Sequence, residues 1–204
     1  ALEISKQAKV KKFLFASTAS LYGDNPTPWK EDMKPYPIEP YSVQKLTIEY
    51  YCKLYAKLYG LKTVIFRFYQ VFGENQRNDT ALYKFFQAVK ENQSITLTQT
   101  TAQSTFSTGQ RDFIYAGDLA EACIEAANTP RTGRGEILNI ASGKVYTMKE
   151  IAEALGAKIE FIPKRGYEVE RHEADMTNTF DLLSWRPKTD VIEWLKEYRK
   201  VLIK

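Results

Sequence analysis

Tyr41 and Lys45 are the residues whose types and spacing point most directly to chemistry. If Pro40 begins a helix, these two side chains lie four residues apart on one face and are close enough to interact. A lysine ammonium beside a phenol favours the phenolate, which makes the phenol a usable base near neutral pH. A nearby hydroxyl such as Thr18 would complete a proton-transfer site. Because a chain with 13 tyrosines contains about one Tyr-x-x-x-Lys by chance, the surrounding elements must support this interpretation.

The elements around this pair indicate a strand, a helix and a second strand. Residues 13–16 form an apolar run typical of a strand buried on both faces of a parallel sheet. A proline-rich loop over 24–40 leads into a helix that ends at Gly60. Residues 63–68 form the second strand, so a right-handed βαβ unit is expected. The hydroxyls of 17–20 follow the first strand, at the edge of the sheet where ligands bind in such folds.

The rest of the chain alternates short strands and helices. Three helices are predicted at 81–90, 119–128 and 148–155, and two more around Leu182 and Trp194. The predicted strands cover 95–97, 111–115, 137–140 and 159–162. Asp118 is expected to cap its helix, and Thr147 with Glu150 forms a capping-box pattern. Residues 98–110 are either a mobile loop or a solvated hairpin. This alternation predicts the α/β class.

Composition limits the possible partners. The 204 residues are 44% hydrophobic, which suits a globular chain of one or two domains. The net charge of +4 is spread along the chain, so it does not indicate nucleic acid, and it is compatible with an anionic small substrate. No apolar run approaches the roughly 18 to 20 residues of a membrane span, and residues 1–12 lack the apolar core of a signal peptide. We therefore expect a cytoplasmic protein with neither a nucleic-acid nor a membrane partner.

Cysteine and histidine are scarce. Cys52 and Cys123 lie in predicted helices, which favours buried free thiols in a reducing compartment. His172 is the only histidine and is expected to be a loop residue. A zinc site or a Ser-His-Asp triad relies on histidine or clustered cysteine, so neither is expected, and no metal site is predicted.

Six short motifs follow one another in an order that resembles a known family. They are FASTASLYG at 15–23, PYSVQK at 40–45, RFYQVFG at 67–73, GQRDFIY at 109–115 followed by Asp118-Leu119-Ala120, NIASG at 139–143 and EAD at 173–175. This order resembles the NAD-dependent epimerase/dehydratase family, whose members are extended short-chain dehydrogenase/reductases similar to UDP-glucose 4-epimerase. The resemblance implies the C-terminal part of a Rossmann-like doubly wound parallel sheet plus a small α/β substrate-binding domain. Residues 1–75 would be the C-terminal half of the dinucleotide-binding domain, and 76–204 would mainly bind nucleotide sugar, with segments returning to the Rossmann sheet.

The resemblance also implies roles for individual residues. The catalytic set is Thr18, which hydrogen-bonds the reacting sugar hydroxyl, Tyr41 as the base, and Lys45, which binds the nicotinamide ribose. The cofactor-binding set is Ala16, Ser17, Tyr41, Lys45, Phe68 and Tyr69. The substrate-binding set is Thr18, Gln70, Arg111, Arg165 and Glu168. Gln70 and Arg111 match residues that contact the diphosphate. Arg165 and Glu168 match loop residues that hold the phosphate and the nucleotide ribose.

The residues alone leave other roles open. Tyr41 and Lys45 form a surface pair in the alternative interpretation, and Thr18 is then a strand-end hydroxyl. Arg111 would pair with Asp112 or Asp118. Gln70, Arg165 and Glu168 would be solvated loop residues.

The resemblance implies NAD as the cofactor, with NADP also open, and a nucleotide-diphosphate sugar as the substrate. The reaction would be hydride abstraction and return at a sugar carbon, C4 of a UDP-sugar. A 4,6-dehydratase, a reductase or a non-catalytic nucleotide-sugar-binding protein stays open; Ala19 and Ser20, in place of the acidic residue of dehydratases, favour the epimerase. A homodimer is also implied, because family members pair through the helix after Lys45, and its tyrosines (Tyr51, Tyr55, Tyr59) would lie in this surface or in the core.

Two departures from the family pattern accompany these motifs. The 204 residues contain no Gly-x-x-Gly-x-x-Gly fingerprint, which in the family lies upstream of the first strand described above. We therefore expect the first half of the dinucleotide-binding domain to be missing, in the gene product or in a fragment of it, and the chain alone to bind NAD poorly. In addition, Gln70 stands where the family usually has asparagine, which lengthens one contact.

Overall fold

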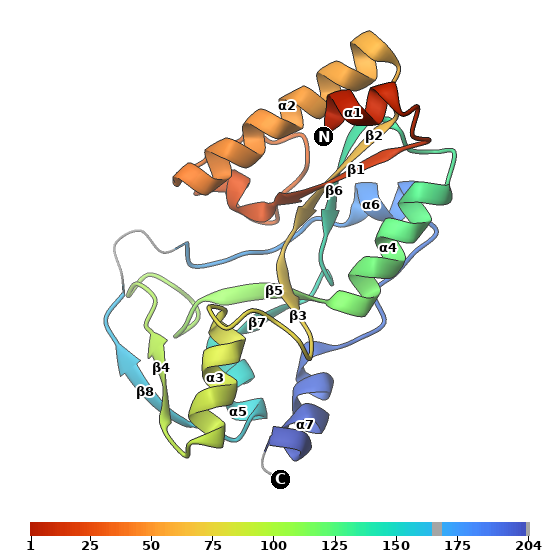
Figure 1. Ribbon diagram of the computed structural model, residues 1–204. Helices are drawn as coiled ribbons and strands as arrows, with labels where there is room; N and C mark the ends of the chain where they lie inside the picture. The colour runs from red at the N-terminus through yellow and green to blue at the C-terminus, as the bar shows by residue number, and fades with distance from the viewer. Residues whose placement is uncertain (165–168, 203–204) are drawn as a thin grey trace.

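The centre of the fold is a parallel three-stranded sheet. The computed structural model describes residues 1–164 and 169–202. The strands are β1 (Phe13–Thr18), β2 (Thr63–Phe68) and β6 (Arg134–Ile140), and they lie in that order. Helix α2 (Pro40–Tyr59) covers one face of the sheet, while α4 (Ala116–Asn128) and α6 (Thr177–Leu182) cover the other (Figure 1). The predicted β1–α2–β2 unit is confirmed, with β1 and β2 parallel.

The alternation of side chains along the strands explains this layering. Successive strand residues point to opposite faces. Ile65 and Ile137 therefore pack with Cys52 on the side of α2, while Val64 and Phe66 pack in the core shared with α4 and α6. Because helices cover both faces of a parallel sheet, the predicted doubly wound α/β class is confirmed.

A second layer of the structure consists of two small sheets and the helices that pack against them. Its elements are β3 (Gln70–Phe72), α3 (Ala81–Lys90), β4 (Ser94–Thr98), β5 (Gln110–Tyr115), β7 (Val145–Thr147), α5 (Met148–Ala154), β8 (Lys158–Ile162) and α7 (Val191–Leu202). Strand β5 lies between β3 and β7, and β4 pairs with β8. A separate apolar core includes Phe72, Phe86 and Leu195, and Figure 1 shows these elements gathered below the first sheet. No helix in the described part of the chain is both long and apolar enough to cross a membrane.

Helix α2 follows the sequence signals at both of its ends. Pro40 is its first residue, where its fixed φ suits the helix and its missing N–H is not needed. Gly60 ends the helix in the left-handed conformation, with φ 67°. Within the helix, Tyr41, Lys45 and Glu49 follow one another at intervals of four residues, so all three lie along one face.

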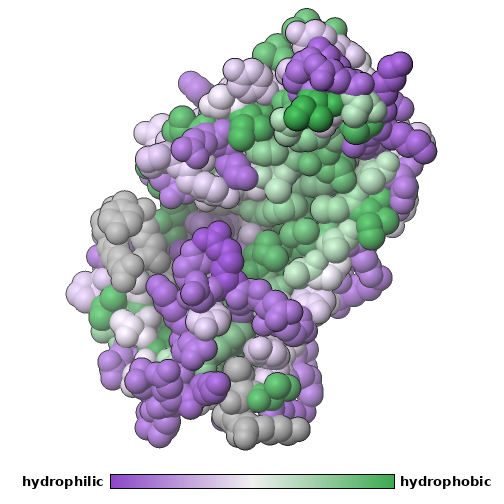
Figure 2. All heavy atoms as spheres, viewed as in Figure 1, coloured by the Kyte–Doolittle hydropathy of each residue, from purple (hydrophilic) through white to green (hydrophobic). Residues whose placement is uncertain are grey.

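Two predictions about local structure are wrong. The strand at 13–16 is not buried on both faces: Phe13, Leu14 and Phe15 are half-buried and Ala16 is exposed, because β1 is an edge strand of the described sheet. Figure 2 shows apolar residues gathered on this side of the molecule, around β1 and α4. Asp118 does not cap its helix, because α4 begins at Ala116 and the buried Asp118 carboxylate lies in the first turn.

Three further features concern the polar segment before β5, the cysteines and the two ends of β1. Residues 99–108 form a hairpin, with an antiparallel bridge between Gln99 and Thr108. Both cysteines are free; Cys52 is buried and Cys123 is partly buried. A short helix α1 (Leu2–Gln7) and a 3-10 turn η1 (Ala19–Tyr22) flank β1.

Helix α5 provides a direct test of the predicted capping box. The Thr147 hydroxyl accepts the Glu150 N–H, and the Glu150 carboxylate accepts the Thr147 N–H. Thr147→Ala is expected to lower the free energy of unfolding by about 1 kcal/mol, since the Glu150 N–H loses its acceptor and the Glu150 carboxylate loses the hydroxyl that donates to it. Urea unfolding followed by circular dichroism measures this loss. Thr147→Ser keeps the acceptor and should stay close to the wild type; equal losses in both variants would rule out the cap as the cause.

Candidate active site

The Tyr41–Lys45 pair lies at the carboxyl end of β1. The Lys45 Nζ donates a 2.7 Å hydrogen bond to the main-chain oxygen of Ala16. The same ammonium lies 5.6 Å from the ring centre of Tyr41 and 5.1 Å from that of Phe15. Tyr41 is 49% exposed, so its phenol is open to a ligand. The structure therefore places the tyrosine and the lysine of the predicted pair close together.

Thr18 and Ser17 end the same strand but have different surroundings. The Thr18 Oγ1 lies 3.2 Å from both the Oγ and the main-chain N of Ser20, so it caps the turn η1. The Ser17 Oγ donates a 2.6 Å hydrogen bond to Glu49 Oε1 and is buried. The hydroxyl of Ser17 is thus engaged inside the protein, and a cofactor contact from this residue would use its main chain.

Phe68 and Tyr69 follow at the end of β2. Phe68 is partly buried, whereas Tyr69 is 7% exposed and its ring lies 6.0 Å from that of Trp29. Burial raises the pKa of Tyr69 well above its ordinary value. Of the two predicted nicotinamide neighbours, Phe68 is therefore the more accessible ring, and Tyr69 belongs mainly to the core.

Gln70 and Arg111 line one pocket of about 120 Å³. The parallel pairing of β3 with β5 places Gln70 beside Phe113, two residues from Arg111. The Arg111 Nη1 donates to the main-chain oxygens of Gln110, at 2.8 Å, and Glu170, at 3.2 Å. The other residues lining the pocket are Val71, Gln76, Thr80, Ala81, Leu82, Phe113 and Met148. A guanidinium and an amide beside apolar walls suit a phosphate-bearing ligand.

The remaining predicted substrate residues, Arg165 and Glu168, lie outside the described residues. The carboxylates proposed as alternative partners of Arg111 bind other groups. Asp112 accepts hydrogen bonds from Ser142 and neighbouring N–H groups, and Asp118 accepts the N–H groups of Lys188 and Thr189.

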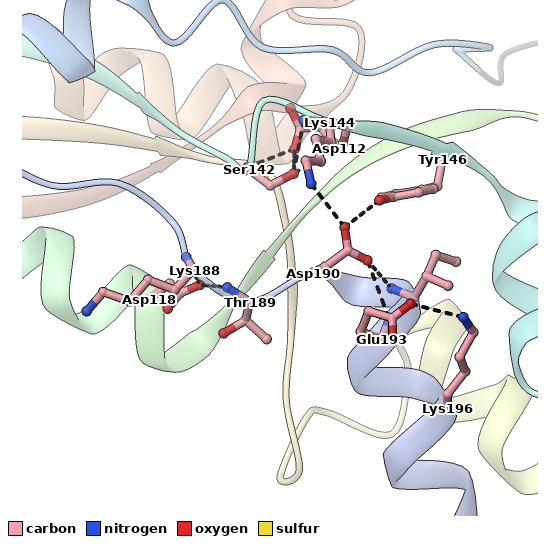
Figure 3. A network of polar contacts seen from close by, with 11 residues as sticks. Asp112, Asp118, Ser142, Lys144, Tyr146, Lys188, Thr189, Asp190, Glu193 and Lys196 are labelled. Atoms are coloured by element: carbon pink, nitrogen blue, oxygen red, sulfur yellow. Dashed lines mark hydrogen bonds and ion pairs between the residues drawn. The ribbon is translucent and has the colours of Figure 1, made fainter.

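A carboxylate network supports the strand that carries Arg111. Asp112 binds the turn after β6 through Ser142, while Asp190 accepts hydrogen bonds from Tyr146, at 2.5 Å, and Lys144, at 3.3 Å. Figure 3 shows these contacts meeting between β5, the β6–β7 turn and the beginning of α7. The network fixes the segments that connect the two layers of the molecule.

Glu49 and Arg67 were not among the predicted site residues. The Arg67 Nη2 lies 2.8 Å from Glu49 Oε2, and the two side chains are 1% and 2% exposed, respectively. The position of Glu49, four residues after Lys45, was a visible signal. Its partner Arg67, 18 residues later on β2, could not be predicted in this way, because the spacing along a helix does not say which strand residue lies against it.

His172 is partly buried in a loop, with its ring 5.0 Å from that of Trp29. Burial, with a smaller effect from Arg111, lowers the pKa of His172 to about 3. Burial also raises the pKa of Asp112 to about 7, although hydrogen bonds from surrounding N–H and O–H groups act in the opposite direction. The two groups therefore affect stability with opposite signs across the acidic range.

The opposite effects of His172 and Asp112 can be tested by measuring stability at different pH values. The contribution of His172 to the stability of the folded state is present above pH 6.5. It is lost as the pH falls toward 3, because the unfolded chain binds the proton more tightly. The Asp112 contribution is present below pH 3.8 and is lost as the pH rises through 7. His172→Phe should leave only the second effect, so stability should fall by up to about 1.4 kcal/mol per pH unit as the pH rises from 4 to 7.

Urea unfolding at several pH values measures this slope. Asp112→Asn is the reciprocal variant and should leave stability rising with pH over the same range. Parallel curves for the wild type and His172→Phe would contradict the prediction.

The donor set at the sheet edge fits the nicotinamide-ribose end of NAD. An ammonium has three N–H donors, and the bond to Ala16 uses one of them, which leaves donors of Lys45 for ribose hydroxyls. The half-buried Phe68, whose ring stacks on that of Phe66 at 5.9 Å, supplies an aromatic surface at the end of the neighbouring strand β2. Among residues 1–164 and 169–202, no three His, Cys, Asp or Glu side chains are grouped so that they could hold a metal ion.

The fold and this site define an α/β protein of the Rossmann type that carries a tyrosine–lysine pair at the carboxyl edge of its sheet. The model of the NAD dependent epimerase/dehydratase family matches residues 1–141. The chain belongs to this family.

Known relatives agree with this assignment. The chain is 32% identical over 203 residues to a UDP-glucuronate 4-epimerase of Thermodesulfobacterium geofontis, covering 96% of this chain and 60% of that protein. It is 31% identical over 207 residues to a putative UDP-glucose 4-epimerase of Methanocaldococcus jannaschii, covering 96% and 64%. The chain therefore spans less than two thirds of the length of these relatives.

Solved structures show the same similarity. A UDP-N-acetylglucosamine 4-epimerase from Methanobrevibacter ruminantium aligns with a TM-score of 0.85 at 29% identity, over 96% of this chain and 64% of that one. A UDP-glucuronic acid 4-epimerase from Bacillus cereus, solved with UDP-glucuronic acid and NAD, aligns with a TM-score of 0.85 at 28% identity, over 98% and 65%.

Proposed function

We propose that this chain supplies the proton-transfer and substrate-binding residues of an NAD-dependent nucleotide-sugar epimerase that acts at C4 of a UDP-sugar. The observation that carries the proposal is the Lys45 ammonium, held at the end of β1 by Ala16 and lying beside the exposed Tyr41 ring. The pocket lined by Gln70 and Arg111 provides a diphosphate site on the neighbouring layer.

Each residue has a defined task in this mechanism. Tyr41 accepts the proton of the sugar hydroxyl, and Lys45 places a positive charge beside the Tyr41 ring and binds the nicotinamide ribose. Thr18 hydrogen-bonds the same sugar hydroxyl and orients it. Bound NAD supplies the hydride acceptor and, in the reverse step, the hydride donor. Arg111 and Gln70 hold the diphosphate, which fixes the sugar relative to the base.

The choice of substrate and reaction rests on the relatives named above. Those proteins are UDP-sugar 4-epimerases, which supports a UDP-sugar and an isomerase reaction here. A 4,6-dehydratase or a reductase would use the same tyrosine and lysine. NADP is the alternative cofactor, because the residues that distinguish the two cofactors are not among the motifs found here.

We infer the same division of labour as in the family. Residues 1–75 carry the proton-transfer site and part of the dinucleotide site, and 76–204 mainly bind the nucleotide sugar. We further propose a homodimer that forms through α2, supported by the exposed Tyr51, Leu54 and Leu58 on this helix. The free thiols support a cytoplasmic location.

The decisive experiment uses the protein made from its complete reading frame. Bound NAD(H) is measured by absorbance and fluorescence, and turnover is assayed with UDP-, GDP- and dTDP-sugars. We expect bound cofactor and interconversion of a UDP-sugar with its C4 epimer. A complete protein that binds UDP-sugars without cofactor or turnover would instead support a non-catalytic binding protein.

Arg111 provides a separate test of the substrate site. Arg111→Met is expected to weaken UDP binding by about 10- to 100-fold, because a charge-assisted hydrogen bond contributes about 1.5–3 kcal/mol. Isothermal titration calorimetry with UDP measures the affinity. Arg77→Met, at an exposed arginine paired with Asp79, is the matched control; an equal effect in both variants would show that only general charge matters.

A further inference from the structure

Ser17, Glu49 and Arg67 form a buried polar triad beneath the candidate site. The Ser17 Oγ lies 2.6 Å from Glu49 Oε1. The Arg67 Nε lies 3.0 Å from Glu49 Oε1, and Nη2 lies 2.8 Å from Oε2. One carboxylate thus receives a serine hydroxyl and a two-pronged guanidinium, a geometry that fixes both direction and distance.

Each member of the triad belongs to a different segment that carries candidate site residues. Ser17 lies between Ala16, which accepts the Lys45 hydrogen bond, and Thr18. Glu49 lies one helical turn after Lys45 in α2. Arg67 directly precedes Phe68 in β2. The triad therefore connects β1, α2 and β2 at the level of the site.

We propose that this triad positions the catalytic pair, by holding α2 in register with the ends of β1 and β2 so that Lys45 stays beside both Tyr41 and Ala16. The proposal rests on the proposed function, because it assigns a role to Ser17, Glu49 and Arg67 in the same reaction. The three residues are positioning residues, since their side chains are buried and bind one another.

Simple stabilisation does not account for this arrangement. A buried ion pair is weak support for stability, because well-packed apolar residues of similar volume often stabilise a protein as well or better. Bidentate bonds to a carboxylate, however, fix both the distance and the angle between the groups that they join. A displacement of about 1 Å at reacting groups lowers the rate by about 100-fold, so directional bonds are useful at this place.

The test compares charge-neutral variants of the complete protein. The double variant Glu49→Met with Arg67→Met removes both charges together, and Ser17→Ala removes only the hydroxyl. We expect kcat to fall by about 10- to 100-fold in the double variant and by a smaller factor in Ser17→Ala, while KM for the nucleotide sugar changes by less than about threefold because the Arg111 pocket is not altered. Thr147→Ala is the control for a loss of stability alone and should keep the wild-type kcat. A double variant with wild-type kcat would overturn the proposal.

A second readout does not depend on turnover. The position of Lys45 is read from a crystal structure of the double variant. We expect the Lys45 Nζ, which lies 2.7 Å from the Ala16 oxygen in the wild-type protein, to move away from it by about 1 Å or more. An unchanged hydrogen bond between Lys45 and Ala16 in the double variant would also overturn the proposal. If the wild-type protein turns over no nucleotide sugar, the proposed function fails, and the crystal structure still decides whether the triad positions the pair.

Discussion

Replacing Tyr41 by Phe is expected to reduce kcat of the complete enzyme by about 100-fold or more, within the range of about 10² to 10⁴ that general acid–base catalysis contributes. The hydroxyl is the only group removed, and the ring beside the Lys45 ammonium is retained. Binding of UDP should stay close to the wild type, because Gln70 and Arg111 lie in a separate pocket. Steady-state turnover and UDP affinity are measured on the same preparation.

A matched control exists on the same helix. Tyr50 is also exposed, so Tyr50→Phe removes an equivalent hydroxyl away from Lys45 and should leave kcat unchanged. Lys45→Met should lower kcat and also weaken cofactor binding, since this ammonium has both tasks in the proposed mechanism. If Tyr41→Phe retained the wild-type kcat, another group would have to be the base.

Local signals were sufficient to predict the elements that carry Tyr41 and Lys45. Pro40 and Gly60 mark the ends of α2 because each suits one end of a helix by its backbone preferences. The apolar run at 63–68 coincides with β2, whose first five residues are buried. A spacing of four residues on a helix then places Tyr41 beside Lys45 without further information.

Features that depend on distant partners could not be predicted in this way. The half-burial of β1 depends on its place at the edge of the described sheet, which its own residues do not specify. Strand β3 has only three residues, too few for a periodic pattern. The shared diphosphate role of Gln70 and Arg111 was predicted from the family resemblance, and the pairing of β3 with β5 gives the structural basis for their lining one pocket.

Trp29 is the clearest example of a residue whose role depends on tertiary structure. It lies in the proline-rich loop, yet it is 1% exposed. Its ring lies 5.1 Å from that of Tyr22 and 5.0 Å from that of His172. Its main-chain N–H binds the oxygen of Glu173, so the loop is fastened to the segment after β8. Composition indicates a loop here, but it does not indicate that the loop contributes a large side chain to the core.

Trp29→Ala is therefore expected to lower the free energy of unfolding by about 3–5 kcal/mol, since it removes a fully buried aromatic ring and leaves a cavity. Urea unfolding followed by circular dichroism measures the loss, because the substitution itself alters tryptophan fluorescence. Trp29→Phe should lose less: it keeps a ring against Tyr22 and gives up the 2.8 Å hydrogen bond to the Asn25 oxygen. Lys30→Ala, at the exposed next residue, should change stability by no more than about 0.5 kcal/mol. A Trp29→Ala protein within that same margin would show that the loop is not part of the core that supports the site.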